Sequence, residues 1–190
     1  MIEIDDFVPP FFQDSILKTL TESNVEWRYL DGVAGTTTEV ETPGVVMSKD
    51  QTAFYHVAFR DGVPESHLFY ALRPMIDALE FHLGRAISDI SRIRIGLTTP
   101  SFFEGHSAPH VDFYAPHHSL LYYVNDSDGD TVFYNERFKG DTNMRKFSVE
   151  KRITPKKGKA VLFEGDHYHS AGITKHTLRR LVINLNYRID

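Results

Sequence analysis

Two residues of types that bind metals lie two positions apart near the middle of the chain, in the stretch APHVDFY (residues 108–114). If this stretch forms an extended strand, His110 and Asp112 point to the same face, because side chains alternate along a strand. An imidazole and a carboxylate that converge on one point supply two ligands of a metal site. A third ligand must then come from another part of the chain.

The best candidates for the third ligand lie in VLFEGDHYHSAG (residues 161–172), where an apolar strand leads into two histidines. We favour His169 over His167, because it has the better offset from the arginines that follow. His167 is then expected near the site or against the substrate. Two imidazoles and one carboxylate with open positions are typical of non-haem Fe(II) oxygenases. A zinc hydrolase of this ligand type usually carries H-E-x-x-H on a helix, which the chain lacks.

A pair of arginines after His169 predicts an anion site. RRLVINLNY (residues 179–187) is expected to be a strand, so Arg179 and Arg180 point to opposite faces and only one points inward. The leucines and isoleucine that alternate after them share one face, which leaves Arg180 and Asn184 on the other. A guanidinium offers a planar fork to a carboxylate, worth roughly 1.5–3 kcal/mol per charge-assisted hydrogen bond. An iron site with a buried arginine therefore suits a small dicarboxylate co-substrate.

These features together resemble the Fe(II)- and 2-oxoglutarate-dependent dioxygenases, and within them the prolyl-4-hydroxylase-like branch. The similarity covers roughly residues 90–190, together with the opening IDDFVPPFF. The segments that carry it are His110-Val111-Asp112, LLYYVND (120–126), GDTVFY (129–134), His169-Ser170-Ala171-Gly172 and Arg180 with LVINLNY.

The resemblance implies that Fe(II) is bound by His110, Asp112 and His169. It implies that Arg180 binds the far carboxylate of 2-oxoglutarate with help from Tyr123. O2 is then the second co-substrate, and ascorbate can serve as an accessory reductant. The implied reaction hydroxylates an aliphatic C–H bond and releases succinate and CO2, and beyond the metal ligands no catalytic side chain is expected.

Further pocket residues follow from their positions on the expected strands. Leu121 shares the face of Tyr123 and is expected to form a wall of the pocket. Asn184 lies four residues past Arg180 and is expected to hydrogen-bond the co-substrate. Arg94 and Thr99, on or beside the strand that precedes the H-x-D motif, are further candidates for contact with the pocket or the substrate.

Apolar spacing predicts helices in the first half of the chain. A short strand at 2–4 precedes a helix with Asp14 as its N-cap. A second helix is predicted over residues 72–83, with Pro74 in its first turn and Gly84 closing it. Residues 31–53 are rich in Gly, Thr and Glu and are expected to form a loop with at most a weak strand.

Alternation and turn signals predict short strands from residue 90 onward. The expected ranges are 91–98, 110–113, 119–125, 131–134, 153–154, 160–164 and 180–187. Helices followed by many short strands predict a mainly β protein with flanking N-terminal helices, built as a double-stranded β-helix, that is, a cupin-like jelly roll. We expect one dioxygenase domain over residues 1–190, with a helical and loop part at about 1–88 and the jelly-roll core at about 89–190.

Composition argues against several classes of function. The chain has no cysteine, which excludes disulfides, thiolate metal sites and a cysteine nucleophile. The net charge of −5 provides no basic field for nucleic acid. The nucleic-acid demethylases of the same superfamily show R-x-N-x-x-x-R after the distal histidine, whereas Arg180, Asn184 and Arg188 have a different spacing. No signal peptide or membrane span is predicted, so the expected location is the cytoplasm.

The sequence leaves the prime substrate open. Loops at about 31–46 and 135–152 are expected to lie over the site and to set substrate choice, but neither contains a motif for a particular substrate. The substrate is either a prolyl or other residue of a peptide, or a free amino acid or similar small molecule. A jelly roll that binds a metal or ligand without turnover is the alternative from a different class. The sequence does not predict the oligomeric state.

Overall fold

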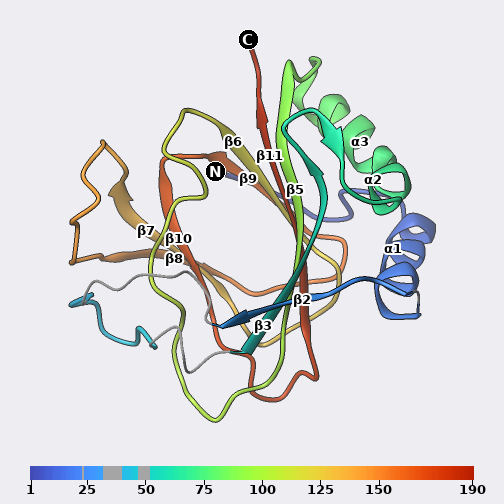
Figure 1. Ribbon diagram of the computed structural model, residues 1–190. Coiled ribbons are helices and arrows are strands. Elements are labelled where there is room, and N and C mark those ends of the chain that lie inside the picture. Colours follow the sequence, from blue (N-terminus) through green and yellow to red (C-terminus); the bar gives the residue numbers. More distant parts are fainter. Residues whose placement is uncertain (23, 32–39, 47–51) are drawn as a thin grey trace.

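The computed structural model describes residues 1–22, 24–31, 40–46 and 52–190. Helices lie on one side of a large antiparallel sheet, and a smaller sheet lies on its other side (Figure 1). The helices are α1 (Pro10–Glu22), α2 (Leu68–Ala71) and α3 (Arg73–Leu83). The strands are β1 (Ile2–Ile4), β2 (Arg28–Asp31), β3 (Thr52–Arg60), β4 (Val63–Pro64), β5 (Asp89–Thr98), β6 (His118–Tyr123), β7 (Thr131–Arg137), β8 (Val149–Ile153), β9 (Ala160–Glu164), β10 (His167–Ala171) and β11 (Arg180–Arg188).

The two sheets have the strand order of a double-stranded β-helix. The larger sheet runs β1-β9-β6-β11-β5-β3-β2, with β4 paired to β3, and the smaller sheet runs β10-β7-β8. The chain around 106–110 extends the smaller sheet through single bridges from His106 to Gly172 and from His110 to His169. After β5 the chain passes back and forth between the sheets, with β6, β9 and β11 in the larger one and β7, β8 and β10 in the smaller one. The predicted jelly-roll fold is confirmed.

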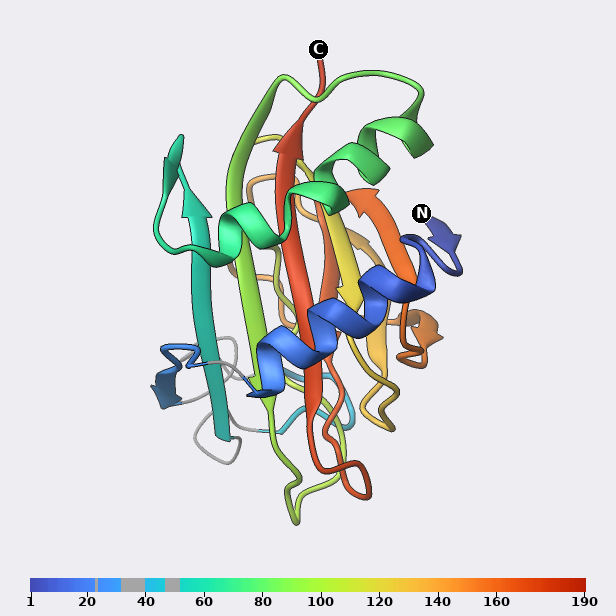
Figure 2. The ribbon, with the colours of Figure 1, turned by 90° about the vertical axis from the view of Figure 1, so that its right-hand side faces the viewer.

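The three helices cover the outer face of the larger sheet, where α1 and α3 run across its strands (Figure 2). Their buried side chains, among them Leu20, Met75 and Leu79, form one core with the sheet residues Ile93 and Ile183. No helix among the described residues is long and apolar enough to cross a membrane. The helical layer closes one face of the sheet, so the opposite face is free to form the site.

Alternation along β6 and β11 separates the two faces. Leu120 and Tyr122 join the core under the helices, whereas Leu121 and Tyr123 join a second cluster between the sheets. On β11 the leucines and isoleucine at 181, 183 and 185 also join the helical core. Arg180 and the polar residues that alternate with them therefore face the smaller sheet, as the sequence predicts.

The helix predictions are confirmed with one correction. α3 ends at Gly84, which has a φ of 67° and forms the left-handed C-cap expected of glycine. The first helix begins at Pro10, four residues before the predicted cap Asp14. Proline fits the first turn of a helix, where its missing N–H is not needed. Asp14 lies inside α1 and pairs with Lys157.

Some strands differ from the prediction. β3 is a nine-residue strand that begins within the predicted loop, and residues 32–39 and 47–51 of that loop lie outside the described residues. The sequence TAFYHVAFR contains a run of four buried residues, so it lacks the clean alternation that marks a strand. β7 and β8 extend into the predicted loop at 135–152 and leave a shorter connection between them.

Replacing Leu79 with alanine tests the helical layer. The side chain of Leu79 is fully buried, and we expect the free energy of unfolding to fall by about 2–5 kcal/mol in urea titrations. Phe81 lies on the same helix and is 82% exposed, so Phe81→Ala is the matched control and should change it by less than about 0.5 kcal/mol. Equal effects of the two substitutions would contradict the packing described here.

Candidate metal centre and adjoining pocket

Three metal-binding side chains converge between the two sheets. One ligand atom each of His110, Asp112 and His169 lies within 4.8 Å of the others. The two histidines exchange backbone hydrogen bonds, each N–H donating to the other's carbonyl oxygen at 3.0 Å, and their rings are 4.6 Å apart. The backbone pair therefore holds the two imidazoles side by side across the edge of the smaller sheet.

The predicted strand at 110–113 is wrong, although its two polar residues do converge. Only His110 makes a bridge there, and residues 111–114 form an irregular bend. The strand partner of β10 lies mainly before the motif, at 106–110. The position of Asp112 therefore depends on side-chain hydrogen bonds and not on strand alternation.

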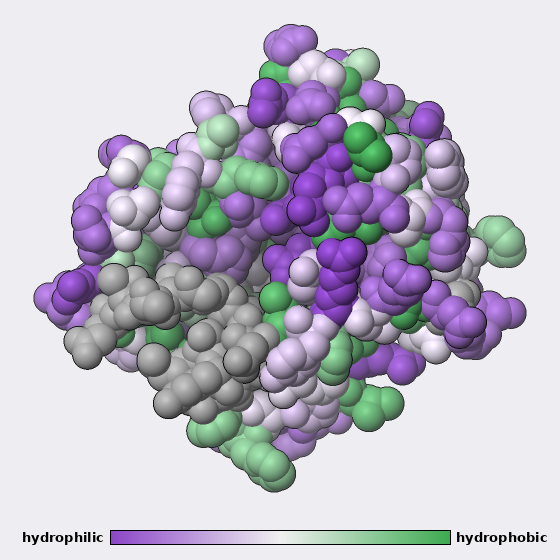
Figure 3. Space-filling model, viewed as in Figure 1, coloured by the Kyte–Doolittle hydropathy of each residue, from purple (hydrophilic) through white to green (hydrophobic). Residues whose placement is uncertain are grey.

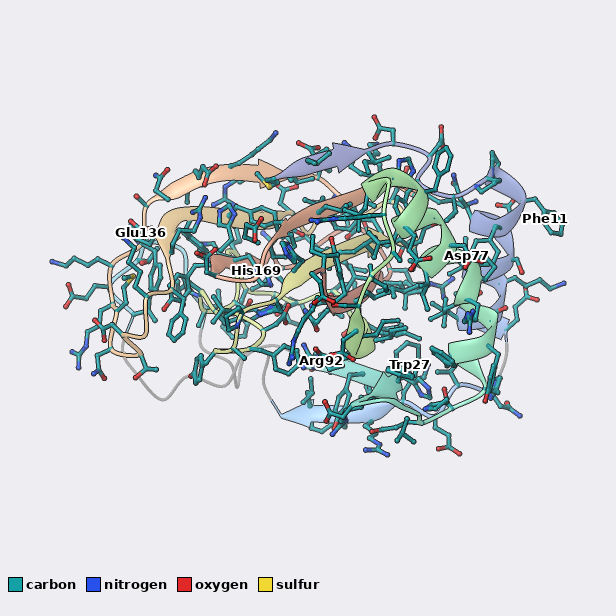
Figure 4. All side chains as sticks on the ribbon, turned by 90° about the horizontal axis from the view of Figure 1, so that it is seen from above. Phe11, Trp27, Asp77, Arg92, Glu136 and His169 are labelled. Carbon is teal, nitrogen blue, oxygen red and sulfur yellow. The ribbon has the colours of Figure 1, made fainter. Side chains whose placement is uncertain are left out.

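The carboxylate of Asp112 is held by donors from three neighbouring strands of the larger sheet. Oδ1 accepts a hydrogen bond from Nη2 of Arg92 on β5 at 3.0 Å. Oδ2 accepts from Ser119 Oγ on β6 at 3.3 Å and from the amide nitrogens of Asn184 and Asn186 on β11, both at 2.9 Å. Viewed from above, Arg92 and His169 lie between the helices and the outer end of the smaller sheet, where Glu136 projects (Figure 4).

The surroundings keep Asp112 ionised. Burial by itself would raise its pKa, because the side chain is only 6% exposed. In acid, where His169 and His110 are protonated, their charges together with that of Arg92 and the hydrogen bond from Asn184 outweigh burial, so the pKa lies well below its ordinary value. A carboxylate that stays negative in a buried site is a suitable ligand for a divalent cation.

The two imidazoles present the nitrogen that a metal needs. Nδ1 of His110 lies 3.1 Å from the carbonyl oxygen of Ala108, and Nδ1 of His169 lies 3.0 Å from that of His167. A carbonyl oxygen only accepts, so each Nδ1 carries the proton and each Nε2 keeps a free lone pair. Burial lowers the pKa of both rings, which favours the neutral form that binds metals. The donor set fits a divalent metal with two nitrogen ligands and one oxygen ligand.

A cavity of about 120 Å³ connects the three ligands to Arg180. In the space-filling view, hydrophilic residues gather around a depression in the middle of the face that is turned toward the viewer (Figure 3). Of the predicted pocket residues, Arg94, Leu121 and Asn184 line the cavity. Thr98 lines it in place of the predicted Thr99, because Thr98 shares the inward face and pairs with Arg180 in the sheet register.

Arg180 is fixed at the far end of the cavity and is 4% exposed. Its Nε donates to the carbonyl oxygen of Gly129 and its Nη2 to Thr131 Oγ1, both at 2.8 Å. Tyr123 donates its hydroxyl hydrogen to the same Thr131 oxygen at 2.7 Å, and its ring lies 5.9 Å from the guanidinium carbon. Burial lowers the pKa of Arg180, but a guanidinium stays charged in proteins. The side chain presents a fixed positive charge to the cavity.

His167 is not brought to the cavity. Its Nε2 lies 3.0 Å from the carbonyl oxygen of Tyr134 and 3.1 Å from a carboxylate oxygen of Glu150. Both rings contact Phe133 and Phe163, so the two histidines share one face as the sequence suggests, but only His169 lines the cavity. His167 thus packs within the smaller sheet, away from the ligand cluster.

Several polar residues that make these hydrogen bonds are not among the sequence candidates. Arg92, Ser119 and Asn186 contact Asp112, and Thr131 joins Arg180 to Tyr123. Arg92 and Asn186 each lie two residues from a predicted pocket residue on the same strand, so alternation contained the signal for both. Thr131 is placed by the pairing between distant strands, which a single sequence does not show.

The part of the chain that contains this site is similar to a known protein family. The family model for the 2OG-Fe(II) oxygenase superfamily matches residues 101–188, which include the three ligand candidates and Arg180. Over this segment the chain is similar to the 2OG-Fe(II) oxygenases, and the His–Asp–His cluster lies inside the matched residues. Comparison with curated protein sequences finds no match.

Solved structures share the fold at low sequence identity. A prolyl-4-hydroxylase of Pseudomonas putida is 14% identical, with 100% of this chain and 92% of that chain covered and a TM-score of 0.54. A prolyl hydroxylase of Trichoplax adhaerens, in complex with a hypoxia inducible factor peptide fragment, is 16% identical with 98% and 82% covered and a TM-score of 0.57. The epimerase SnoN from nogalamycin biosynthesis is 14% identical with 98% and 76% covered and a TM-score of 0.64. At these identities the similarity shows a shared fold.

The pKa of His110 predicts a pH dependence of stability. Burial, with the charge of His169, lowers this pKa from 6.5 to about 4. Between these values the unfolded chain binds a proton that the folded protein does not, so stability present above pH 6.5 is lost as the pH falls toward 4. Urea titrations of the metal-free protein should show this loss, and His110→Asn should reduce its slope. An unchanged slope in the variant would contradict the assignment.

Proposed function

We propose that this protein is an Fe(II)- and 2-oxoglutarate-dependent dioxygenase that hydroxylates an aliphatic C–H bond and releases succinate and CO2. The observation that carries the proposal is that the His–Asp–His cluster and the buried Arg180 lie at two ends of one cavity. A metal at one end and a fixed cation at the other suit a keto acid with a second carboxylate.

His110, Asp112 and His169 would hold the iron, which supplies O2 activation and hydrogen abstraction when bound. The hydrogen bonds to Asp112 and to the two Nδ1 atoms orient the ligands before the metal arrives. Such pre-orientation by neighbouring groups is usual in metal sites and strengthens binding.

Arg180 would bind the far carboxylate of 2-oxoglutarate. Its Nε and Nη2 already bond Gly129 and Thr131, and among the described residues no hydrogen bond of Nη1 is found. Thr131 accepts hydrogen bonds from Arg180 and Tyr123, so its own hydroxyl hydrogen is available to the co-substrate. Leu121 and Val182 line the cavity between its two ends and limit the access of water.

The prime substrate of the proposal is a prolyl or other residue of a peptide, or alternatively a free amino acid or other small molecule. The prolyl hydroxylase with a bound peptide fragment supports the first class, and SnoN, crystallised with a nogalamycin compound, supports the second. A jelly roll that binds ligands without turnover is the remaining alternative. Slow decarboxylation of 2-oxoglutarate without any prime substrate would separate the enzyme from that alternative.

The first experiment is an anaerobic titration of Fe(II) and 2-oxoglutarate into the metal-free protein. We expect the weak visible charge-transfer band of the chelated keto acid, and expect it only when both are present. The band should be absent in Asp112→Ala and His169→Ala. His167→Ala is the matched control, because it removes a neighbouring histidine that contacts Glu150, and it should keep the band. Tight iron binding without a band would overturn the proposal.

Two adjacent arginines provide a test of the proposed 2-oxoglutarate site at the Arg180 end of the cavity. Arg180→Ala should raise the 2-oxoglutarate concentration at half-maximal absorbance of the charge-transfer band by about 10- to 100-fold, because charge-assisted hydrogen bonds are lost. Arg179 is less buried and points away from the cavity, so Arg179→Ala should leave this concentration unchanged. The reverse result would mean that the assigned register of β11 is off by one residue.

A further inference from the structure

A second arginine lines the cavity without an ionic partner. Arg94 projects from β5, and its guanidinium carbon lies 4.8 Å from the centre of the Tyr55 ring. Among the described residues, neither a hydrogen bond nor an ion pair of Arg94 is found. The neighbouring Arg92 differs, because it is paired with Asp112 at 3.0 Å. Burial lowers the pKa of Arg94, and the charge of Arg92 lowers it further.

The sheet register places Arg94 at the metal end of the cavity. Arg94 lies opposite Asn184, which contacts Asp112, whereas Thr98 lies opposite Arg180. The separation of four positions from Arg94 to Thr98 corresponds to about 13 Å along the strand. Arg94 is therefore beside the expected reaction centre, at the opposite end from the proposed far-carboxylate site.

Among the described residues, the charges of the site leave Arg94 without an ion pair of its own, although Asp112 raises its pKa from a distance. Asp112 neutralises Arg92. In the proposed complex, one carboxylate of 2-oxoglutarate meets Arg180 and the other meets the metal. A partly buried guanidinium without an anion is costly, because it has lost water without gaining a partner. An anionic group near the metal would remove that cost.

We infer that Arg94 binds a carboxylate of the prime substrate. This inference rests on the proposed function and narrows its substrate to compounds with a free carboxylate, either a free amino acid or the C-terminal residue of a peptide. The Tyr55 ring lies against one face of the guanidinium and leaves its edge available to a carboxylate. The bound carboxylate would orient the rest of the substrate over the metal.

The test measures binding without turnover. Protein loaded with Mn(II) and 2-oxoglutarate is titrated by calorimetry with free L-amino acids, one at a time, and with the carboxamide of each. Dipeptides with a free or an amidated C-terminus form the second arm. We expect at least one acid to bind and its amide to bind about 10- to 100-fold more weakly, as the loss of a charge-assisted contact predicts. Binding of an acid in the first arm would identify a free amino acid as the substrate, and binding only in the second arm would identify the C-terminal residue of a peptide.

Variants assign the effect to Arg94. Arg94→Met should abolish the preference for acid over amide, and Arg94→Lys should keep part of it. Arg60→Met is the matched control: Arg60 lies on the neighbouring strand β3, pairs with Glu65 and is 46% exposed, so the preference should persist. In each variant the charge-transfer band with Fe(II) and 2-oxoglutarate should form at the wild-type concentration of 2-oxoglutarate.

Three results would overturn the inference. These are equal binding of acids and amides, no binding of any acid, or a raised 2-oxoglutarate requirement in Arg94→Met. The third would mean that Arg94 contacts the co-substrate. Failure of the proposed function is distinguishable, because the charge-transfer band would then be absent from the wild-type protein itself.

Discussion

The burial of one carboxylate governs the arrangement of this site. Asp112 lies in an irregular bend, and its negative charge is tolerable in the interior only because four side chains donate hydrogen bonds to it. Those donors come from β5, β6 and β11, so the carboxylate is fixed relative to the central strands of the larger sheet. The two histidines are fixed relative to the smaller sheet. The ligand cluster therefore joins the two sheets at the point where they face each other.

A polar interior face is possible because the other face of the same strands is fully apolar. Leu181, Ile183 and Leu185 pack under the helices, while Arg180 and Asn184 alternate with them toward the cavity. The helical layer supplies the hydrophobic stabilisation that the cavity side lacks. The N-terminal part of the chain thus contributes to the site indirectly, through the sheet that it covers.

Much of this arrangement could be predicted from the sequence, and the failures have physical causes. Periodicity identified α3 and β9, since their apolar residues follow one period without interruption. Convergence of His110 and Asp112 was predicted correctly from an incorrect premise, because an isolated bridge and hydrogen bonds replace the expected strand. Sequence spacing also placed His167 on the face of His169, and both rings do contact Phe133 and Phe163, but only His169 reaches the cavity. The contacts of Arg92 with Asp112 and of Thr131 with Arg180 depend on which strands pair, and strand pairing cannot be predicted from a single sequence.

The tight packing around Arg180 has a consequence for the loop that precedes β7. Its guanidinium is bonded to Gly129 and Thr131, and a side chain on Gly129 would lie 2.7 Å from the carbonyl oxygen of Gly172. Backbone is thus packed tightly beside the arginine, and a side chain at position 129 would force the Gly129 carbonyl away from the guanidinium that it holds. Glycine at this position is therefore part of what fixes the positive charge in the cavity.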